Sequence, residues 1–188
     1  MPKITRDQVK VPVDVMPDMR DVYITNYMKA TRETGRLMLF ACDQKIEHMN
    51  KDFYGEGIDI ADAEPEHLFK IGSQGVCGVL AGQRGLIAQY AADYPEINYL
   101  VKMNSKTNLV KTSQEDPYSP QLTDLDAVLA MRDAGVNIVG LGYTIYLGSE
   151  YESTMMAEAG ELIAQAHANG LLVVLWIYPR GKAVTAEK

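Results

Sequence analysis

Apolar residues gather in short unbroken runs that alternate with amphipathic segments along most of the chain. The five runs are 37–41, 75–81, 99–103, 136–141 and 171–177. Each run is continuously apolar and ends at a polar or glycine-rich segment, which is typical of strands buried on both faces of a parallel sheet. The pattern therefore predicts five buried parallel strands.

Segments between most of these runs carry apolar side chains at helical spacing. From 153 to 170 the spacing predicts one long helix, with Ser153 placed to cap its start and Gly170 to end it. Further helices are predicted at 19–30, from Pro65 onward, and at 124–135 with Thr123 as the N-cap.

Strands that alternate with helices indicate an α/β protein with a parallel sheet. Two architectures fit this rhythm. An open doubly wound sheet needs about five strands and would be complete at this length. An eight-stranded barrel typically needs about 250 residues, so 188 residues would hold only part of one.

Composition and charge narrow the class of partners. The net charge of -7 argues against nucleic acid, because phosphate backbones select basic surfaces. No apolar stretch approaches the roughly 18 residues of a membrane span, and the N-terminus carries no signal-peptide core. Cys42 and Cys77 lie in apolar runs, which favours free buried thiols over a disulfide framework. These features predict a soluble cytoplasmic protein that binds neither nucleic acid nor membrane.

Polar side chains at the carboxyl ends of the runs are the candidate site, because chemistry collects there in both architectures. Asp43 follows the first run, and a carboxylate there is either a cap or a functional group. Lys102 lies inside the third run, where pairing with an acid such as Asp43 competes with a catalytic role. Trp176, Tyr178 and Arg180 leave the fifth run together, as a substrate wall, a proton donor and an anion clamp or as an interface.

Motifs for other chemistries are missing from the sequence. No G-x-G-x-x-G stands between a strand and a helix, and there is no P-loop. His48, His67 and His167 are far apart, so a zinc site is not expected; His67 and His167 are expected on helix surfaces. We therefore expect no metal and no cofactor.

Four segments in order resemble a known family: 43–48 (DQKIEH), 100–104 (LVKMN), 143–150 (YTIYLGSE) and 175–181 (LWIYPRG). Together they resemble the archaeal-type class I fructose-bisphosphate aldolases of the DeoC/LacD group, over residues 38–184. The resemblance implies a (β/α)₈ barrel, of which this chain would hold about the first five βα units. Residues 1–36 would be an N-terminal lead-in and helix, and residues 37–188 a single partial-barrel domain.

The resemblance also implies site roles and an activity. Asp43 would lie beside the Schiff-base lysine and Tyr178 would act as general acid/base. The residues implied to bind substrate are Trp176, Arg180, His48 and Lys102. The implied reaction is metal-independent cleavage of fructose 1,6-bisphosphate to dihydroxyacetone phosphate and glyceraldehyde 3-phosphate, in glycolysis and gluconeogenesis, by a homo-oligomer. Lys45 stands where the family usually has glycine, which puts the exact sugar in doubt.

The family's Schiff-base lysine lies on strand six, more than twenty residues beyond the Tyr-Pro-Arg-Gly segment, whereas this chain ends at Lys188. The resemblance therefore implies an incomplete, inactive piece of an aldolase. Two alternatives stay open: a non-catalytic half-barrel that needs a partner chain, and a sister Schiff-base aldolase for another keto or aldehyde phosphate.

Overall fold

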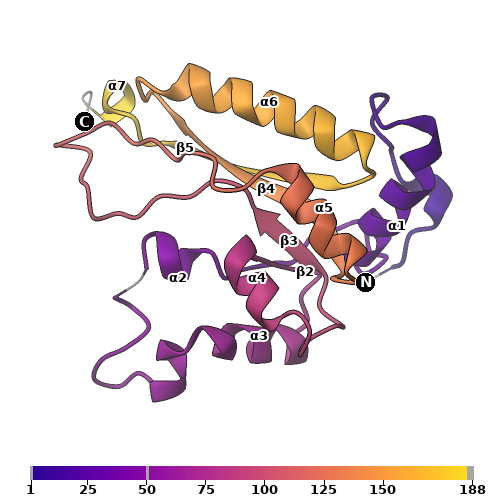
Figure 1. Cartoon of the computed structure of the whole chain (residues 1–188), viewed down its shortest axis with the longest axis horizontal. Coiled ribbons are helices and arrows are strands. Elements are labelled where there is room, and N and C mark those ends of the chain that lie inside the picture. The colour runs from indigo at the N-terminus through magenta and orange to yellow at the C-terminus, as the bar shows by residue number, and fades with distance from the viewer. Residues whose placement is uncertain (1, 50, 186–188) are drawn as a thin grey trace.

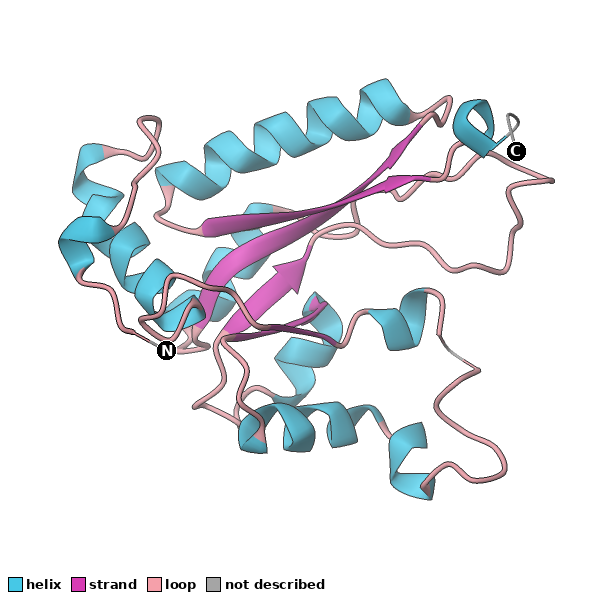
Figure 2. Ribbon diagram, turned by 180° about the vertical axis from the view of Figure 1, so that it is seen from behind, coloured by secondary structure: helices cyan, strands magenta, loops and turns pink. Residues whose placement is uncertain are grey.

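Five parallel strands form one curled sheet in a computed structural model that describes residues 2–49 and 51–185. The strands, in chain order and in spatial order, are β1 (Leu39–Ala41), β2 (Val79–Gln83), β3 (Tyr99–Lys102), β4 (Ile138–Leu147) and β5 (Leu172–Pro179). A doubly wound sheet would reverse its strand order, whereas a barrel keeps it. The sequential order and the curl (Figures 1 and 2) confirm the partial (β/α)₈ barrel.

Most of the helices pack on the outer face of the sheet, whereas the end of the first one, at Ala30, joins the apolar cluster of the concave face. The helices are α1 (Arg20–Ala30), α2 (Gln44–Glu47), α3 (Pro65–Gln74), α4 (Arg84–Tyr90), α5 (Leu125–Asp133), α6 (Glu152–Ala168) and α7 (Lys182–Thr185), with 3-10 turns at Arg6–Gln8, Pro17–Met19 and Ile60–Ala63. The long α6 runs beside β4 and β5 (Figure 1). Helix α1 contacts β4 and β5. The Asn26 amide of α1 donates to the Gly170 carbonyl, just before β5.

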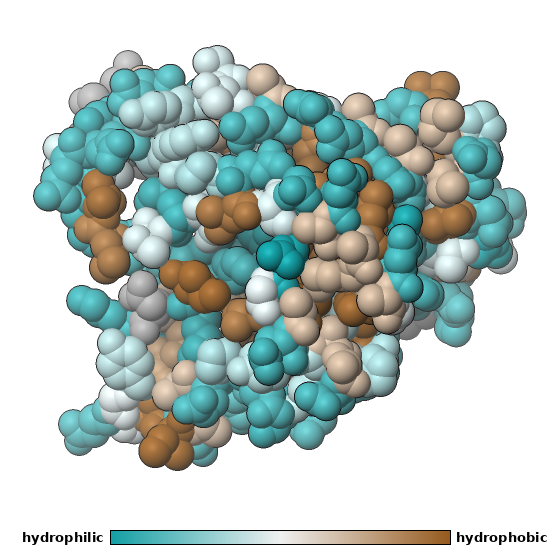
Figure 3. All heavy atoms as spheres, in the orientation of Figure 1, coloured by the Kyte–Doolittle hydropathy of each residue, from teal (hydrophilic) through white to brown (hydrophobic). Residues whose placement is uncertain are grey.

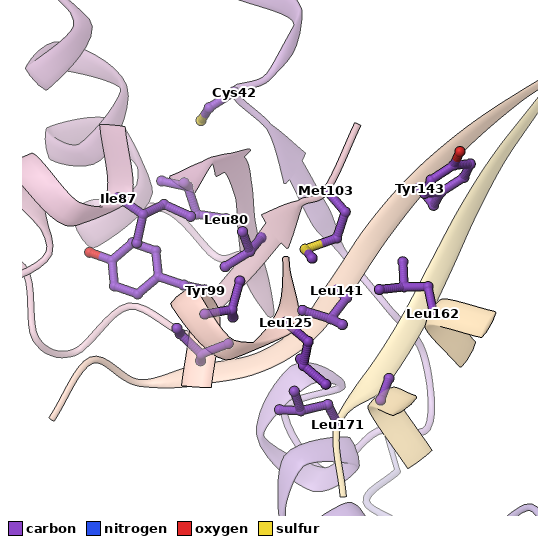
Figure 4. Packing of buried hydrophobic residues seen from close by; sticks show 14 of the residues in the cluster. Cys42, Leu80, Ile87, Tyr99, Met103, Leu125, Leu141, Tyr143, Leu162 and Leu171 are labelled. Atoms are coloured by element: carbon purple, nitrogen blue, oxygen red, sulfur yellow. The ribbon is translucent and has the colours of Figure 1, made fainter. Parts of the chain in front are cut away.

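Strand residues alternate between two apolar clusters. The larger cluster lies between the strands and the outer helices; Leu80, Tyr99, Leu141 and Leu162 belong to it (Figure 4). The smaller cluster lines the concave face and includes Val79, Ala81 and Leu100, packed against Trp176. Because side chains alternate along a strand, Lys102 lies on the concave side with Leu100.

Several boundaries differ from those predicted. Asp124, and not Thr123, caps α5 by accepting from the Ala127 amide at 2.8 Å. Ser153 lies inside α6 and makes no cap, because the helix begins one residue earlier. Strand β4 continues to Leu147, because the aromatic and β-branched residues after Gly142 extend the buried ladder. Helices α2 and α4 were not predicted, being too short to show helical spacing.

His167 is buried, so its expected surface position is wrong. Its side chain faces the N-terminal lead-in, where Nδ1 lies 2.8 Å from Asp14 Oδ2. Its ring also meets Tyr23 of α1 edge-on at 5.8 Å. The lead-in buries Val9 and Val15, so it packs on the molecule through apolar contacts as well.

Cys42 is buried and Cys77 half-buried, both as free thiols. Among the described residues, no helix combines the length and the apolar run that crossing a bilayer requires.

Candidate active site

The predicted site residues converge at the carboxyl edge of the sheet. Asp43 follows β1 and directly precedes α2, and Lys102 is the last residue of β3. Trp176 and Tyr178 lie two positions apart on β5, so they point to the same face of the sheet. His48 and Arg180 follow α2 and β5 and border the same mouth, where both line one cavity.

Lys102 is held in a buried cluster with two carboxylates. Its Nζ lies 2.5 Å from Glu47 Oε1 and 3.4 Å from Asp43 Oδ2, and its side chain is fully buried. Ser105 donates its hydroxyl to the same Glu47 oxygen at 2.9 Å. Asp43 and Glu47 stand one helical turn apart, so both carboxylates face one side of α2. We call Asp43, Glu47 and Lys102 the ion cluster.

The charges of the ion cluster do not balance if both carboxylates are ionised. Burial raises the pKa of Glu47, although the neighbouring Lys102 ammonium opposes the shift. Asp43 Oδ1 is buried and has no hydrogen-bond partner within the described part of the chain. A buried oxygen without a partner is costly, so Asp43 presents an acceptor suited to an incoming ammonium or hydroxyl group.

The Trp176 ring lies beside Lys102 on the concave side of the sheet. The Lys102 ammonium lies 5.3 Å from the centre of its ring. Gly142 on β4 makes room for this ring, because a Cβ at that position would lie 2.4 Å from a Trp176 ring carbon. The glycine and the tryptophan are therefore a matched pair that fixes the aromatic surface.

Two tyrosines on adjacent strands form a wall at the mouth. Tyr146 of β4 and Tyr178 of β5 are register partners, and their rings stack with centroids 6.1 Å apart. The Arg180 guanidinium lies 4.6 Å from the Tyr178 ring centre. Burial raises the pKa of Tyr178 and raises that of Tyr146 to about 12, so both phenols keep their protons at neutral pH. We call Tyr146, Tyr178 and Arg180 the tyrosine wall.

A long loop between β3 and α5 arches over this mouth (Figure 1). Buried Asp116 anchors it, with one carboxylate oxygen accepting from the Lys182 amide at 2.8 Å and the other from the Glu150 amide at 3.0 Å. After β5 the chain passes close to Gly148. Gly181 permits this close approach, since a Cβ at that position would collide with the Gly148 backbone. The loop, β4 and β5 thus form one framed opening.

Lys45 lies apart from the ion cluster. Its Nζ donates to the Asp62 carbonyl at 2.5 Å and lies 4.2 Å from the centre of the Phe53 ring. Burial lowers its pKa, but its contacts are with the loop that leads to α3. The residue therefore braces that loop.

The structure brings Asp43, Lys102, Trp176 and Tyr178 to one place and adds two residues that the sequence analysis did not single out, Glu47 and Tyr146. Both stand inside segments already quoted for the resemblance, and Glu47 could have been found from its helical spacing to Asp43. Within residues 2–49 and 51–185, no group of three His, Cys, Asp or Glu side chains is arranged to hold a metal ion.

Comparisons with known proteins agree on one family. A family model described as DeoC/LacD family aldolase matches residues 37–188. A fructose-bisphosphate aldolase/6-deoxy-5-ketofructose 1-phosphate synthase of Methanocaldococcus jannaschii is 52% identical over 99% of this chain and 60% of its own length. The chain thus spans about three fifths of that relative.

Solved structures give the same result. The fructose-bisphosphate aldolase from Slackia heliotrinireducens is 79% identical with a TM-score of 0.96, covering 99% of this chain and 58% of that one. An archaeal fructose-1,6-bisphosphate aldolase with its catalytic lysine bound to the carbinolamine intermediate is 25% identical with a TM-score of 0.69, covering 84% and 57%. By its fold, its sequence and its matched family model, the chain belongs to the DeoC/LacD aldolase family.

Proposed function

We propose that this chain supplies the first five βα units of a class I, Schiff-base aldolase that cleaves fructose 1,6-bisphosphate reversibly into dihydroxyacetone phosphate and glyceraldehyde 3-phosphate. The observation that carries the proposal is the meeting of Asp43, Lys102 and Tyr178 at the carboxyl edge of a partial barrel whose relatives are named as class 1 aldolases. The reaction belongs to the whole protein, since the chain spans only 60% of its Methanocaldococcus relative.

Tyr178 is assigned one of the two proton transfers of the reaction. Cleavage of the C3–C4 bond requires a base for the C4 hydroxyl proton and an acid for the carbon that receives the electrons. Burial raises the pKa of Tyr178, so its phenol rests as the acid and can donate its proton to that carbon, while a different group takes the C4 hydroxyl proton. Its position on the concave side of β5, beside Tyr146, supports this assignment.

Asp43 and Lys102 are assigned the positioning of the reacting amine and its adduct. The Lys102 side chain is fully buried and its Nζ is already engaged by the Glu47 and Asp43 carboxylates, so it is not free to attack a carbonyl. Lys45 is engaged with the loop before α3. We therefore assign neither lysine the Schiff base, and we infer that the chain alone is catalytically inactive.

Two alternative functions are each favoured by one observation. A sister Schiff-base aldolase is favoured by the second half of the Methanocaldococcus relative's name, 6-deoxy-5-ketofructose 1-phosphate synthase. A non-catalytic half-barrel with a partner chain is favoured by apolar side chains on the edge strand β5, where Leu175 and Ile177 are 36% and 51% exposed. Elution size distinguishes a half-barrel bound to a partner chain from a monomer. The identity of the carbonyl compound that is trapped distinguishes a sister aldolase from a fructose-bisphosphate aldolase.

Borohydride trapping with dihydroxyacetone phosphate tests the proposal. We expect no adduct on this chain and one adduct on an extended chain, made by joining this sequence to the part of the Methanocaldococcus relative that lies beyond it. Intact mass and peptide mapping locate the adduct. An adduct on Lys102 or Lys45 would contradict the assignment of these two lysines, and an extended chain that folds without forming an adduct would contradict the aldolase proposal.

A further inference from the structure

A cavity of about 540 Å³ opens at the amino ends of β1 and β2, beside the end of α1. Its lining residues come from 30–38, which joins α1 to β1, and from 76–78, which precedes β2. We call it the basal cavity. Because all five strands are parallel, it lies at the opposite edge of the sheet from the candidate site. In Figure 1 the loop that arches over the mouth is at the left and α1 is at the right.

Apolar and cationic side chains line the basal cavity together. Leu37, Met38 and Val76 are exposed there, Met38 by 62% and Val76 by 76%. On the face shown in Figure 3, the strongly hydrophobic residues stand in small separate groups among hydrophilic ones. Arg32 and Arg36 supply positive charge, and no carboxylate lines the cavity. An apolar surface beside two cations is complementary to a ligand with an apolar body and an anionic head.

Both guanidinium groups lack an ionic partner. Within the described part of the chain, neither Arg32 nor Arg36 forms a salt bridge. The acid of this segment, Glu33, is paired with Lys3 of the lead-in at 2.5 Å. A guanidinium presents its N–H donors as a planar fork that fits two oxygens of a carboxylate or a phosphate. The two arginines are therefore available to an anion.

Arg32 occupies a backbone position that usually belongs to glycine. Helix α1 ends in a Schellman motif, in which the Glu33 amide donates to the Met28 carbonyl at 2.9 Å and the Arg32 amide to the Lys29 carbonyl at 3.1 Å. Arg32 has a φ of +51° and Glu33 a φ of +63°. A residue with a Cβ is strained in this left-handed region, and such strain collects at functional sites. The placement of an arginine there thus calls for a function of its side chain.

Hydrogen bonds hold the walls of the basal cavity in place. The Ile4 amide of the lead-in donates to the Glu33 carbonyl at 2.7 Å, and the Gly78 amide donates to the Met38 carbonyl at 2.7 Å. Gly78 also lets β2 begin directly against α1, because a Cβ on it would lie 1.7 Å from the Ala30 carbonyl oxygen. The cavity is therefore preformed, which lowers the cost of ordering on binding.

We propose that the basal cavity binds an amphipathic organic anion. Arg32 and Arg36 hold its phosphate or carboxylate head, and Leu37, Met38 and Val76 contact its apolar body. The volume of the cavity lies within the range of about 300–1,000 Å³ that is typical of small-molecule sites. A ligand there touches no residue of the candidate active site, so this binding is independent of the proposed function. Its direct effect is on stability, since a ligand that binds only the folded chain opposes unfolding.

Isothermal titration calorimetry with octyl phosphate tests the proposal in this chain and in the extended chain. We expect saturable binding at one site in both chains, with affinity about tenfold weaker in Arg36→Met, as for a lost charge-assisted hydrogen bond. Arg20→Met is the matched control, because Arg20 is an exposed arginine at the start of the same helix and forms no salt bridge among the described residues.

Two further compounds identify the parts of the ligand that are recognised. Inorganic phosphate lacks the apolar body and should bind about tenfold or more weakly than octyl phosphate. Octanoate replaces the phosphate head by a carboxylate, and the tighter of the two octyl compounds identifies the preferred head. Inorganic phosphate that binds as tightly as octyl phosphate would overturn the amphipathic ligand.

Arg32→Gly separates binding from folding. Glycine adopts the left-handed conformation without strain, so the urea midpoint should stay the same or rise. The affinity for octyl phosphate should nevertheless fall about tenfold. A lower midpoint with unchanged affinity would show that the Arg32 side chain serves the fold alone, and the proposal would fail.

Three other results would overturn the basal cavity as a ligand site. Equal affinities in Arg36→Met and Arg20→Met would place the binding elsewhere. Binding to this chain that is lost in a folded extended chain would mean that the rest of the barrel fills the cavity. Self-association on gel filtration that Arg36→Met abolishes would mean that a second copy covers it. Schiff-base trapping is a separate measurement, so the proposed function can fail while the basal cavity still binds its ligand.

Discussion

At the β1–β3 side of the mouth, the ionisable groups are buried and paired with one another, whereas at the β4–β5 side they stand over tyrosine rings. Lys102 is 1% exposed between Glu47 and Asp43. Arg180 is exposed and has no ionic partner among the described residues. The ion cluster satisfies most of its charge internally, which fits the positioning role proposed for it. The tyrosine wall leaves the charge of Arg180 unsatisfied, which fits the binding and proton-transfer roles proposed for its members.

This comparison predicts that the two sides respond differently to mutation. Loss of a member of the ion cluster should damage the fold, because it leaves a buried charge without a partner. Loss of a member of the tyrosine wall should damage function while the fold persists.

The largest expected effect is on turnover at the tyrosine wall. Tyr178→Phe removes the phenolic proton and should lower kcat of the extended chain by about two to four orders of magnitude, as is typical for loss of a general acid/base. Tyr54→Phe, at a tyrosine 58% exposed on the loop before α3, is the matched control. Full activity in Tyr178→Phe, measured by coupled assay of triose phosphate release, would remove Tyr178 from the mechanism.

The next effect is on stability at the ion cluster. Lys102→Met leaves the carboxylates of Asp43 and Glu47 facing each other in a buried place, and should lower the free energy of unfolding by about 3–5 kcal/mol. Urea unfolding followed by circular dichroism measures the loss. Lys29→Met is the control, because the Lys29 ammonium lies at the surface and donates to the Asn137 side chain at 2.9 Å. Equal midpoints for the two variants would mean that the ion cluster contributes nothing to the fold.

The sequence predicted the strands well and their lengths and neighbours less well, for physical reasons. The apolar runs predicted all five strands, because strands buried on both faces are continuously hydrophobic. Strand β4 was predicted too short, because its outer half carries tyrosines and a threonine that still face the interior. The apolar runs alone cannot report which strand lies beside which, so the choice of the barrel over the open sheet depended on the family resemblance, and the spatial order of the strands confirms it.

The candidate site was predicted only in part, because only some of its residues stand directly at strand ends. Asp43, Lys102, Trp176 and Tyr178 stand at strand ends, where position alone suggests function. Glu47 lies on α2, a helix of only four residues, so the sole sequence signal for it was its spacing of four positions from Asp43. Tyr146 lies on β4 beyond the predicted run, and its pairing with Tyr178 depends on the register of β4 and β5.

A smaller effect is expected on the pH dependence of stability. Burial raises the pKa of Glu47 above its ordinary value of 4.5, so the folded chain binds this proton more tightly than the unfolded chain does. This contribution to stability is fully present below pH 4.5 and is lost as the pH rises through the raised folded-state value. Glu47→Gln cannot ionise, so the decline should be shallower in that variant.

Parallel urea titrations of the wild-type chain and Glu47→Gln, at intervals from pH 4 upward, measure this difference. Other carboxylates titrate in both chains and cancel in the comparison. Identical slopes in the two chains would mean that Lys102 offsets burial completely and that Glu47 keeps its ordinary pKa in the folded chain.

The smallest effect on stability is expected from Arg180→Met. Its guanidinium is exposed and stacks on Tyr178, and such a contact at an exposed site contributes about 0.5–1 kcal/mol. The urea midpoint should therefore stay close to that of the wild-type chain, while the KM of the extended chain for fructose 1,6-bisphosphate rises. A midpoint loss as large as that of Lys102→Met would make Arg180 a structural residue. Such a result would contradict the proposal that the ion cluster stabilises the fold whereas the tyrosine wall serves function.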